Sequence, residues 1–509
     1  MKKTLAIILA MLMCLSVMVS CGGKTDPADT TTAATQGTQA SATEATTTAP
    51  ATESPYDANG FLKDDLDPSL NYNGQEITIL YWDDVARPEF EVKELTGDLI
   101  SDAIYARNAA VEERLGLELN WVGTPGSYSV QENYINTAEN DVKSGGEFDV
   151  FAAYSMSAVT MTLRGLYRDL LPTEHLNFDQ PWWPATLIEN TSINGKLYFC
   201  SGDISTNVLN QMAITLFNKE MATELNIPNL YQIVDEGKWT IDKMAELAST
   251  AYSDLNGDTK ADLSDRFGIG LRKNIMFDAF FIGSNLHSIE KDANGVMIIS
   301  DEFSSEKTHD LLNKVITIFH NSNYTAFPAT VEGWDNKPFA NGQVLFMMDL
   351  ANVTSSTELA DTSVTYGVLP VPKYDEAQEI HMTSLEYGYT MYGASIVVDD
   401  ATRNTISALL ECMASESYRQ VIPAMFETTM KLKYSSGEDD ARMYDIIRGG
   451  ISFDLGRLFA EPLEKLTYYA FREAANNANT NWASVTKAKT RVMQKQLDAL
   501  VEKLANLAE

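Results

Sequence analysis

The stretch EITILYW, residues 76–82, begins a repeating order of strands and helices. It is rich in residues that favour β-strands, and apolar residues at helical spacing follow it as far as Gly116. LELNWV, residues 117–122, alternates like a second strand, and FDVFAA, residues 148–153, predicts a third strand after another helical stretch. Strand, helix, strand, helix, strand predicts a parallel sheet covered by helices, so the predicted fold class is α/β.

The later part of the chain continues this pattern with more helix. The predicted strands are residues 193–199 (a turn and a strand), 213–217, 344–348, 365–372 and 393–398. Residues 239–330 are mainly helical in pattern, and the chain after residue 398 is predicted to be helical to its end. The last helix has one apolar stripe, made of Val485, Ala488, Val492, Leu497, Leu500, Val501 and Leu504.

The first residues predict export and a lipid anchor. Lys2 and Lys3 precede an apolar run over residues 5–19, which is too short for an ordinary membrane span, and Ser20 then precedes Cys21. This arrangement resembles the lipobox of bacterial lipoproteins, in which cleavage before the cysteine leaves a thiol that carries diacylglycerol. We therefore expect a signal peptide over residues 1–20 and lipidation at Cys21, on the extracellular face of the cell membrane. A plain secretory signal or a short anchor is the alternative.

The segment that follows and the net charge limit which partners the protein can have. Residues 21–55 are rich in Thr, Ala and Ser and have almost nothing to bury, which predicts a disordered tether. The net charge of −33 repels phosphate backbones, so we expect no nucleic-acid partner. Only Cys200 and Cys412 remain for the folded part, too few for a disulfide scaffold, and buried free thiols are favoured.

Several short segments, in the same order along the chain, resemble bacterial extracellular solute-binding proteins of family 1, the carbohydrate-binding lipoproteins of ABC importers. The matching segments are Asp102–Asn108 with Val111–Arg114, Glu147–Val150, Gly195–Tyr198 with Gly202–Asp203, Asn218–Glu220, Gly237–Thr240, Asn341–Gln343, Tyr366–Pro372, and Met443–Ile447 with Phe453–Gly456. Each segment alone is a weak signal. Their common order behind a lipobox is a strong one.

The resemblance implies a two-lobed, periplasmic-binding-protein-like fold of type II, in which each lobe is a sheet flanked by helices and a multi-strand hinge joins the lobes. Within a solute-binding domain over residues 56–509, the first lobe would comprise about 70–200 and 395–432, and the second about 201–394 and 433–509. The implied function is capture of a neutral sugar or oligosaccharide and its delivery to the transmembrane subunits of an ABC permease. We expect a monomer that does no chemistry on its ligand.

Residues at strand ends are the candidate ligand-binding residues, because a sugar needs aromatic platforms for its C–H faces and polar side chains for its hydroxyls. For each aromatic residue, packing in the core is the alternative, and for Trp182, Trp183 and Trp482 it is the favoured one. The predicted ligand-binding residues are Trp82, Asp83, Tyr154, Ser155, Asp203, Asn207, Trp334, Asn336, Tyr387 and Tyr389.

One loop has calcium-loop spacing. Side-chain oxygens recur at loop positions 1, 3, 5, 9 and 12, and a backbone carbonyl is available at position 7. The candidate ligands are Asp254, Asn256, Asp258, Lys260, Asp262 and Asp265. Thr259 stands where glycine usually makes the sharp turn, and a solvated turn between helices is the alternative. We expect no other cofactor.

The sequence contains few of the residue spacings that are typical of catalytic sites. The motifs of zinc proteases, serine hydrolases, phosphate-binding loops and dinucleotide-binding proteins do not occur, and the five histidines are scattered. With 71 Asp and Glu residues, a carboxylate pair for glycoside hydrolysis could be assembled in many ways, so its possibility decides nothing. The predicted protein is therefore not an enzyme. A membrane-tethered glycan-processing enzyme and a non-transport adhesin or sensor on the same fold are the alternatives.

Overall fold

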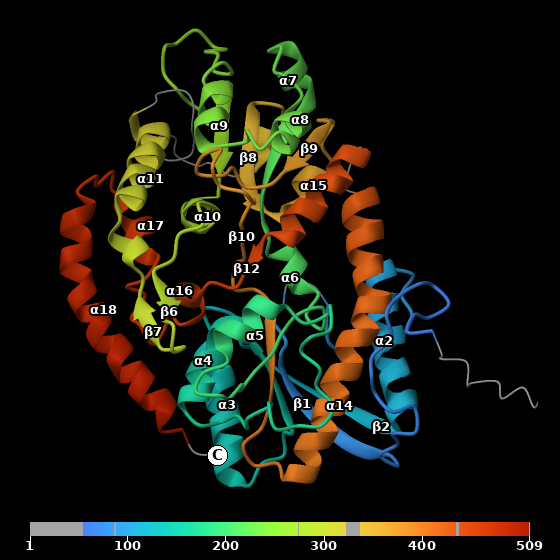
Figure 1. The fold of residues 1–509 in the computed structure, drawn as a ribbon. Coiled ribbons are helices and arrows are strands. Elements are labelled where there is room, and N and C mark those ends of the chain that lie inside the picture. The colour runs from blue at the N-terminus through green and yellow to red at the C-terminus, as the bar shows by residue number, and fades with distance from the viewer. Residues whose placement is uncertain (1–53, 86–87, 273, 322–335, 434–436, 508–509) are drawn as a thin grey trace, which may run out of the picture. The chain divides into compact units, whose positions relative to one another are not determined.

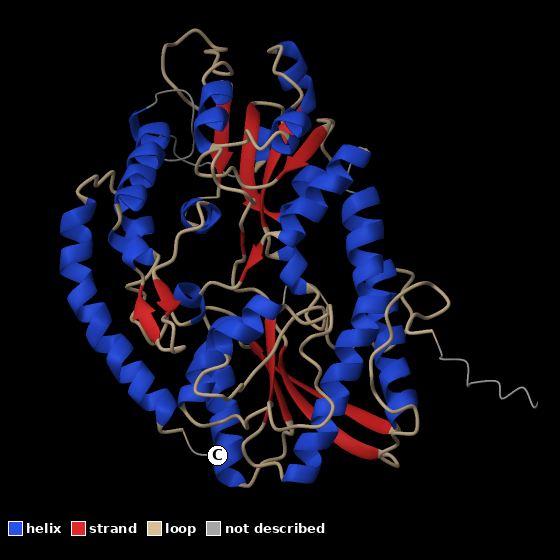
Figure 2. Cartoon of the chain, viewed as in Figure 1, coloured by secondary structure: helices blue, strands red, loops and turns tan. Residues whose placement is uncertain are grey.

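The computed structural model describes residues 54–85, 88–272, 274–321, 336–433 and 437–507. The signal peptide, Cys21, nearly all of the predicted tether and Trp334 lie outside these residues. The described residues contain two four-stranded sheets, each flanked by helices (Figures 1 and 2).

The first sheet has the strand order β11-β3-β1-β2. Its strands are β1 (Gln75–Trp82), β2 (Leu117–Thr124), β3 (Val150–Tyr154) and β11 (Thr390–Ala394). Ile79 of β1 pairs with Trp121 of β2 and with Val150 of β3, both in parallel, which confirms the predicted parallel sheet. β11 is antiparallel to β3, so the chain returns to this sheet by Thr390, before the predicted strand over residues 393–398 begins.

Helices α2 (Leu99–Leu115), α3 (Gln131–Ser144), α4 (Ser155–Leu163), α5 (Ala185–Thr191) and α14 (Asp400–Glu416) belong to this part of the chain. α2 begins at Asp98, whose carboxylate accepts the backbone N–H of Ser101, and ends at Gly116, which has a φ of 60° that favours glycine. α2 packs on α14, while α3 and α4 pack on β3. We call this sheet with its helices the first lobe.

The second sheet has the order β5-β8-β4-β9. Its strands are β4 (Ala213–Asn218), β5 (Phe267–Leu271), β8 (Val344–Leu350) and β9 (Tyr366–Leu369). β8 is antiparallel to β4 and parallel to β5. The prediction of a mainly helical segment over residues 239–330 missed β5, which is fully buried at the edge of this sheet.

The second lobe comprises this sheet with its helices. They are α7 (Lys219–Glu224), α8 (Leu230–Asp235), α9 (Ile241–Ala248), α10 (Ile275–Gly283), α12 (Lys337–Ala340), α13 (Thr357–Ala360), α15 (Glu438–Gly449) and the short helix η3 (Ala351–Ser355). α15 packs on β9 and ends where a two-stranded ladder begins, formed by β10 (Thr383–Ser384) and β12 (Ile451–Ser452).

Among the described residues, three crossing segments connect the lobes. The first, residues 200–212, contains α6 (Asn207–Asn210), and the second is residues 385–392. They run antiparallel and side by side, since Cys200 pairs with Tyr392 and Met212 with Leu385. The third, residues 417–433, continues α14 as two π-helical segments, η4 (Ser417–Val421) and η5 (Pro423–Lys433), and precedes α15.

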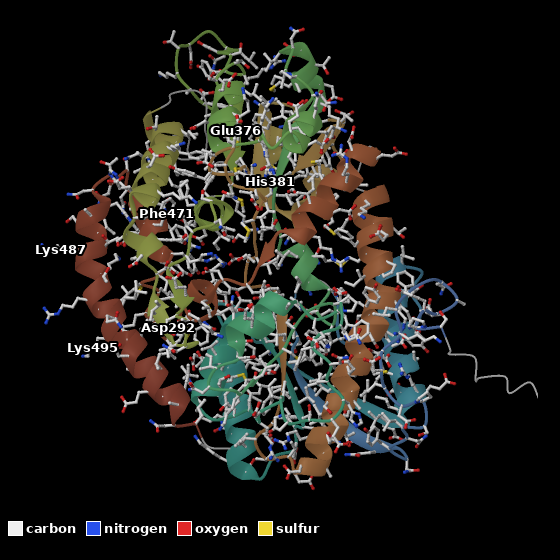
Figure 3. The ribbon with its side chains drawn as sticks, in the orientation of Figure 1. Asp292, Glu376, His381, Phe471, Lys487 and Lys495 are labelled. Atoms are coloured by element: carbon white, nitrogen blue, oxygen red, sulfur yellow. The ribbon has the colours of Figure 1, made fainter. Side chains whose placement is uncertain are left out.

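The remaining elements pack beside the second lobe. They are α11 (Glu306–Ile316), α16 (Leu455–Leu458), α17 (Tyr469–Asn476), α18 (Trp482–Ala505), the hairpin β6 (Ile289–Lys291) and β7 (Met297–Ile299), and the short helices η1 (Asp301–Ser304) and η2 (Thr317–Asn321). α16 and the end of α18 also lie next to α4 of the first lobe. Trp482 of α18 packs against Phe471 of α17, whereas Lys487 and Lys495 extend away from the helix (Figure 3). Val492, assigned to the apolar stripe from sequence, is 44% exposed, and Met493 is buried instead.

Candidate functional site

The predicted aromatic residues at the strand ends of the first lobe lie together. The rings of Trp82 and Tyr154 meet edge to face, with centroids 5.3 Å apart, and both side chains are buried. Trp82 Nε1 donates a hydrogen bond to Thr390 Oγ1 at 2.8 Å. Asp83, the next residue along the chain, is exposed. The two rings therefore stabilise the end of the sheet in this structure, and the adjoining carboxylate faces solvent.

Three more predicted residues join this cluster. Ser155 Oγ donates to the backbone carbonyl of Tyr387 at 2.7 Å, and the Ser155 N–H donates to the carbonyl of Tyr389 at 2.9 Å. The ring of Tyr389 contacts Phe453 edge to face, with centroids 5.9 Å apart. The start of α4 is thus attached to the second crossing segment, and Phe453 covers it.

A cavity of ≈ 280 Å³ lies between the lobes, beside this cluster. Residues of the first lobe, of the first and third crossing segments, and of the chain around α15 and β12 line it. They are Pro181, Trp182, Pro184, Ala185, Thr186, Gly202, Asp203, Ser205, Val208, Leu209, Ile422, Arg448, Gly449, Ile451 and Phe453. The volume is close to the lower limit of about 300 Å³ for small-molecule sites. Asp203 is the predicted ligand-binding residue that lines it.

Asp203 forms an ion pair in the lining of this cavity. Arg448 Nη2, at the end of α15, lies 3.1 Å from Asp203 Oδ1. The carboxylate side chain is only 14% exposed, and burial raises its pKa from the usual 3.8 to about 6, although Arg448 lowers it. Ionising this carboxylate in the folded protein is therefore costly, and donors from a ligand would stabilise the charge.

Trp182 also lines the cavity, although the sequence favoured a packing role for it. Its indole Nε1 donates to Glu411 Oε1 at 3.0 Å, and its carbonyl accepts the N–H of Asp203 at 3.1 Å. Gly202 permits this approach, because a Cβ at that position would lie 2.3 Å from the Trp182 carbonyl oxygen. Trp182 therefore packs in the core, as predicted, and also lines the cavity.

The other candidate residues lie elsewhere. The Asn207 N–H donates to the buried carboxylate of Glu89 at 3.0 Å, and Asn336 lies just before α12, beside Asp349. Trp183 donates to Glu411 and Trp482 to the carbonyl of Phe303, so these two tryptophans pack in the core as predicted.

A buried ionic cluster lies on the second-lobe side of the strand ends. The guanidinium of Arg457 stacks 4.4 Å from the ring centre of Tyr387 and donates to Asp278 and Glu386, each at 2.9 Å. Arg472 Nε donates to the other oxygen of Asp278, also at 2.9 Å. Because two cations and two carboxylates meet here, their charges balance, and the cluster attaches α16 and α17 to α10 and to the second crossing segment.

The candidate calcium loop folds on its own hydrogen bonds. Asp254 accepts the N–H groups of Gly257 and Thr259, and Asp265 accepts those of Leu255 and Asp262. Thr259 has a φ of 64°, so it adopts the turn that glycine usually makes at this position. Among the residues that the structure describes, no group of three or more His, Cys, Asp or Glu side chains is arranged to hold a metal ion. Calcium binding stays a prediction.

Two sheets joined by three crossing segments, with a cavity between the lobes, define the fold of the two-lobed solute-binding proteins. No protein-family model and no curated protein matches this sequence, whereas many solved structures match the fold. The cyclic α-maltosyl-1,6-maltose binding protein of Arthrobacter globiformis has a TM-score of 0.56 at 12% identity, over 84% of this chain and 99% of that one.

Two further solved structures have the same fold. A cyclo/maltodextrin-binding protein in complex with maltotetraose has a TM-score of 0.53 at 12% identity, over 86% of this chain and 99% of that one. The galacto-N-biose/lacto-N-biose I-binding protein of a Bifidobacterium longum ABC transporter, in complex with lacto-N-biose, has a TM-score of 0.53 at 13% identity, over 84% of this chain and 98% of that one. The predicted two-lobed fold is confirmed.

Within the described ranges, none of the helices combines the length and the apolar character that a membrane span requires. Cys200 and Cys412 are both buried, and both thiols are free.

Proposed function

We propose that this chain is the substrate-binding lipoprotein of an ABC importer, which captures a neutral sugar or oligosaccharide between its lobes and delivers it unaltered to the permease. The observation that carries the proposal is the cavity between the lobes, where Trp182 and Phe453 lie with the Asp203–Arg448 ion pair. The solved proteins of the same fold include sugar-binding proteins, one of them from an ABC transporter, which supports the same function.

The chemistry of the cavity fits an uncharged polyol. Trp182 and Phe453 offer apolar surface to C–H groups, while Asp203 accepts hydrogen bonds and Arg448 donates them, as vicinal hydroxyls require. The ion pair has no net charge, so an anionic ligand would be attracted to Arg448 and repelled by Asp203 with similar strength. A neutral ligand avoids this conflict.

The position of the site also fits capture by closure. Asp203 belongs to the first crossing segment and Arg448 to α15, which packs on the second sheet, so rotation of the lobes changes the distance between them. The lipobox and the tether would keep such a monomer near its permease, on the extracellular face of the membrane. Capture needs no chemistry on the ligand.

Gly449 provides the test, because it lines the cavity and a Cβ built on it meets no atom within 4 Å. Calorimetric titration with a panel of neutral oligosaccharides should find a ligand for the wild-type chain. The variant Gly449→Phe should weaken that binding by at least about 100-fold, the loss expected when a bulky side chain displaces ligand contacts. The matched variant Gly449→Ala should bind within about twofold of wild type.

Three results would overturn the proposal. If Gly449→Phe and Trp182→Ala both bind the sugar as tightly as wild type, the cavity is not the site. If the panel sugars are cleaved during incubation, and product accumulates in proportion to enzyme, the tethered glycan-processing enzyme is the correct alternative. An adhesin or sensor would bind sugar without cleaving it, and would fail to support sugar uptake when expressed with the permease subunits.

A further inference from the structure

A carboxylate that the proposed site does not use lies at the hinge. Glu89 follows β1 in the first lobe and is fully buried. Its carboxylate accepts hydrogen bonds from the hydroxyl of Ser205 at 3.0 Å and from the backbone N–H of Asn207 at 3.0 Å, both in the first crossing segment. It also accepts a short hydrogen bond from the hydroxyl of Thr390, in the second crossing segment. One side chain thus connects two segments that are far apart in sequence.

The third crossing segment is connected to the same point through Arg107 of α2. This guanidinium is also fully buried. Arg107 Nη2 donates to the backbone carbonyl of Glu89 at 3.0 Å, and Arg107 Nη1 donates to the hydroxyl of Ser417 at 3.3 Å. Asn108 holds the guanidinium in place by accepting from its Nε and Nη2. Glu89 and Arg107 together therefore contact every one of the three crossing segments.

The candidate ligand-binding residues lie one hydrogen bond away. Thr390, which donates to Glu89, accepts the indole N–H of Trp82, and Thr390 N–H donates to Ser205 Oγ. Asp203 precedes Ser205 by two residues and lines the cavity. A displacement of the first crossing segment at Ser205 would therefore move a residue of the proposed site.

We propose that Glu89 is the positioning residue of the hinge. Its buried carboxylate, supported by Arg107, fixes the first-lobe ends of the three crossing segments to one point, so that they turn together when the lobes close. The proposal rests on the lobe closure that the proposed function requires, but it concerns a residue outside the ligand cavity. Its contacts join the first lobe to the segments that leave it, and Figure 1 shows α6 between the two sheets.

Burial raises the pKa of Glu89, while the hydrogen bonds from Thr390, Asn207 and Ser205 lower it. Each of these groups can donate to an ionised carboxylate, which accepts on both oxygens. A glutamine of the same shape would place an NH₂ group against these donors. The glutamine oxygen can occupy the place of Oε2 and still accept the Asn207 N–H, while its NH₂ group lies at the place of Oε1 and requires the Thr390 hydroxyl to turn from donor to acceptor. Every remaining hydrogen bond then loses the charge of the carboxylate, so the variant Glu89→Gln holds the crossing segments less tightly.

Hydrogen–deuterium exchange on the full mature chain without ligand tests this inference. In Glu89→Gln, exchange should accelerate by about tenfold in all three crossing segments, which corresponds to the difference between a hydrogen bond to a charged acceptor and one to a neutral acceptor. Ser205→Ala, which removes one donor and keeps the carboxylate, should show a smaller effect with the same pattern. In the double variant Glu89→Gln/Ser205→Ala, the loss of protection, expressed as a free energy, should be smaller than the sum of the losses in the two single variants.

The matched control is Asp141→Asn. Asp141 is a buried carboxylate of the first lobe that accepts the N–H groups of Glu147 and Phe148 within the same lobe. It should change local exchange before β3 and leave the crossing segments as in wild type. If Glu89→Gln accelerates exchange only around residues 205–207, or if Asp141→Asn affects the crossing segments equally, Glu89 is an ordinary packing residue and the proposal is wrong.

Ligand binding separates this proposal from the proposed function. With a sugar that binds the wild-type chain, Glu89→Gln should raise Kd by about tenfold, and the ligand should protect the crossing segments less than in wild type. If the wild-type chain binds none of the sugars, the proposed function fails, and the exchange of the unliganded variants still decides the role of Glu89. If binding is unchanged in Glu89→Gln, the residue does not position the hinge.

Discussion

Replacing Asp203 by asparagine tests the electrostatics of the cavity. The carboxylate lies 3.1 Å from the guanidinium of Arg448, and its side chain is 14% exposed. Burial raises its pKa to about 6, and Arg448 offsets only part of that effect. Asparagine has nearly the same shape but no proton to lose, so the variant isolates the cost of ionising this one group.

The sign and size of the effect follow from the two states of the chain. In the unfolded chain Asp203 ionises near its usual pKa of 3.8, whereas in the folded protein it keeps its proton up to about pH 6. Between these values the folded state binds more protons, so the free energy of unfolding falls as pH rises. A pKa raised from 3.8 to about 6 corresponds to about 3 kcal/mol, lost between pH 4 and pH 6 and constant above that.

Urea unfolding followed by tryptophan fluorescence at pH 4, 5, 6, 7 and 8 measures this. The free energy of unfolding of Asp203→Asn, relative to wild type, should rise by about 2 to 3 kcal/mol from pH 4 to pH 6 and then stay level. In Arg448→Met the pKa of Asp203 should be higher still, so the fall in stability should extend to higher pH. If the free energy of unfolding changes with pH in the same way in wild type and in Asp203→Asn, the reasoning is refuted.

Three other predictions concern groups outside the cavity. Cys200 and Cys412 should not react with a maleimide in the native protein, because burial raises the pKa of both thiols. Both thiols should react in urea. Labelling of either thiol in the native protein would contradict this prediction. Millimolar calcium should raise the melting temperature, and Asp258→Asn should reduce the rise; an unchanged melting temperature would remove calcium from the loop at residues 254–265. Cys21→Ser should release the chain from the membrane into the medium, and equal retention would exclude the lipid anchor.

Much of the fold could be predicted because its strands have strong local signals. β1 and β2 lie within one or two residues of the stretches assigned from sequence, since β-branched and aromatic residues recur there. β5 gave no such signal, because it is short and contains two glycines. One of them, Gly268, is needed for packing, since a Cβ there would lie 2.3 Å from the carbonyl oxygen of Ala248 at the end of α9.

The site was less predictable because its parts come from distant segments. Asp203 could be predicted, since it follows the predicted strand over residues 193–199 and lies in one of the segments that resemble the solute-binding family. Its partner Arg448 is 245 residues away on α15, and no local pattern connects the two. Trp182 could be identified as buried from its residue type, but the fold alone determines that one edge of it lines a cavity.

The position of Phe453 explains why most of the predicted strand-end residues are buried while Asp203 reaches the cavity. The chain from β12 to α16 passes between the lobes, so that Phe453 contacts Tyr389 and also lines the cavity. This passage covers the aromatic cluster at the ends of β1 and β3, and it leaves space on the side of Asp203 and Trp182. A ligand in that space would contact a crossing segment and the end of α15 at once, and so it would bind best with the two lobes closed.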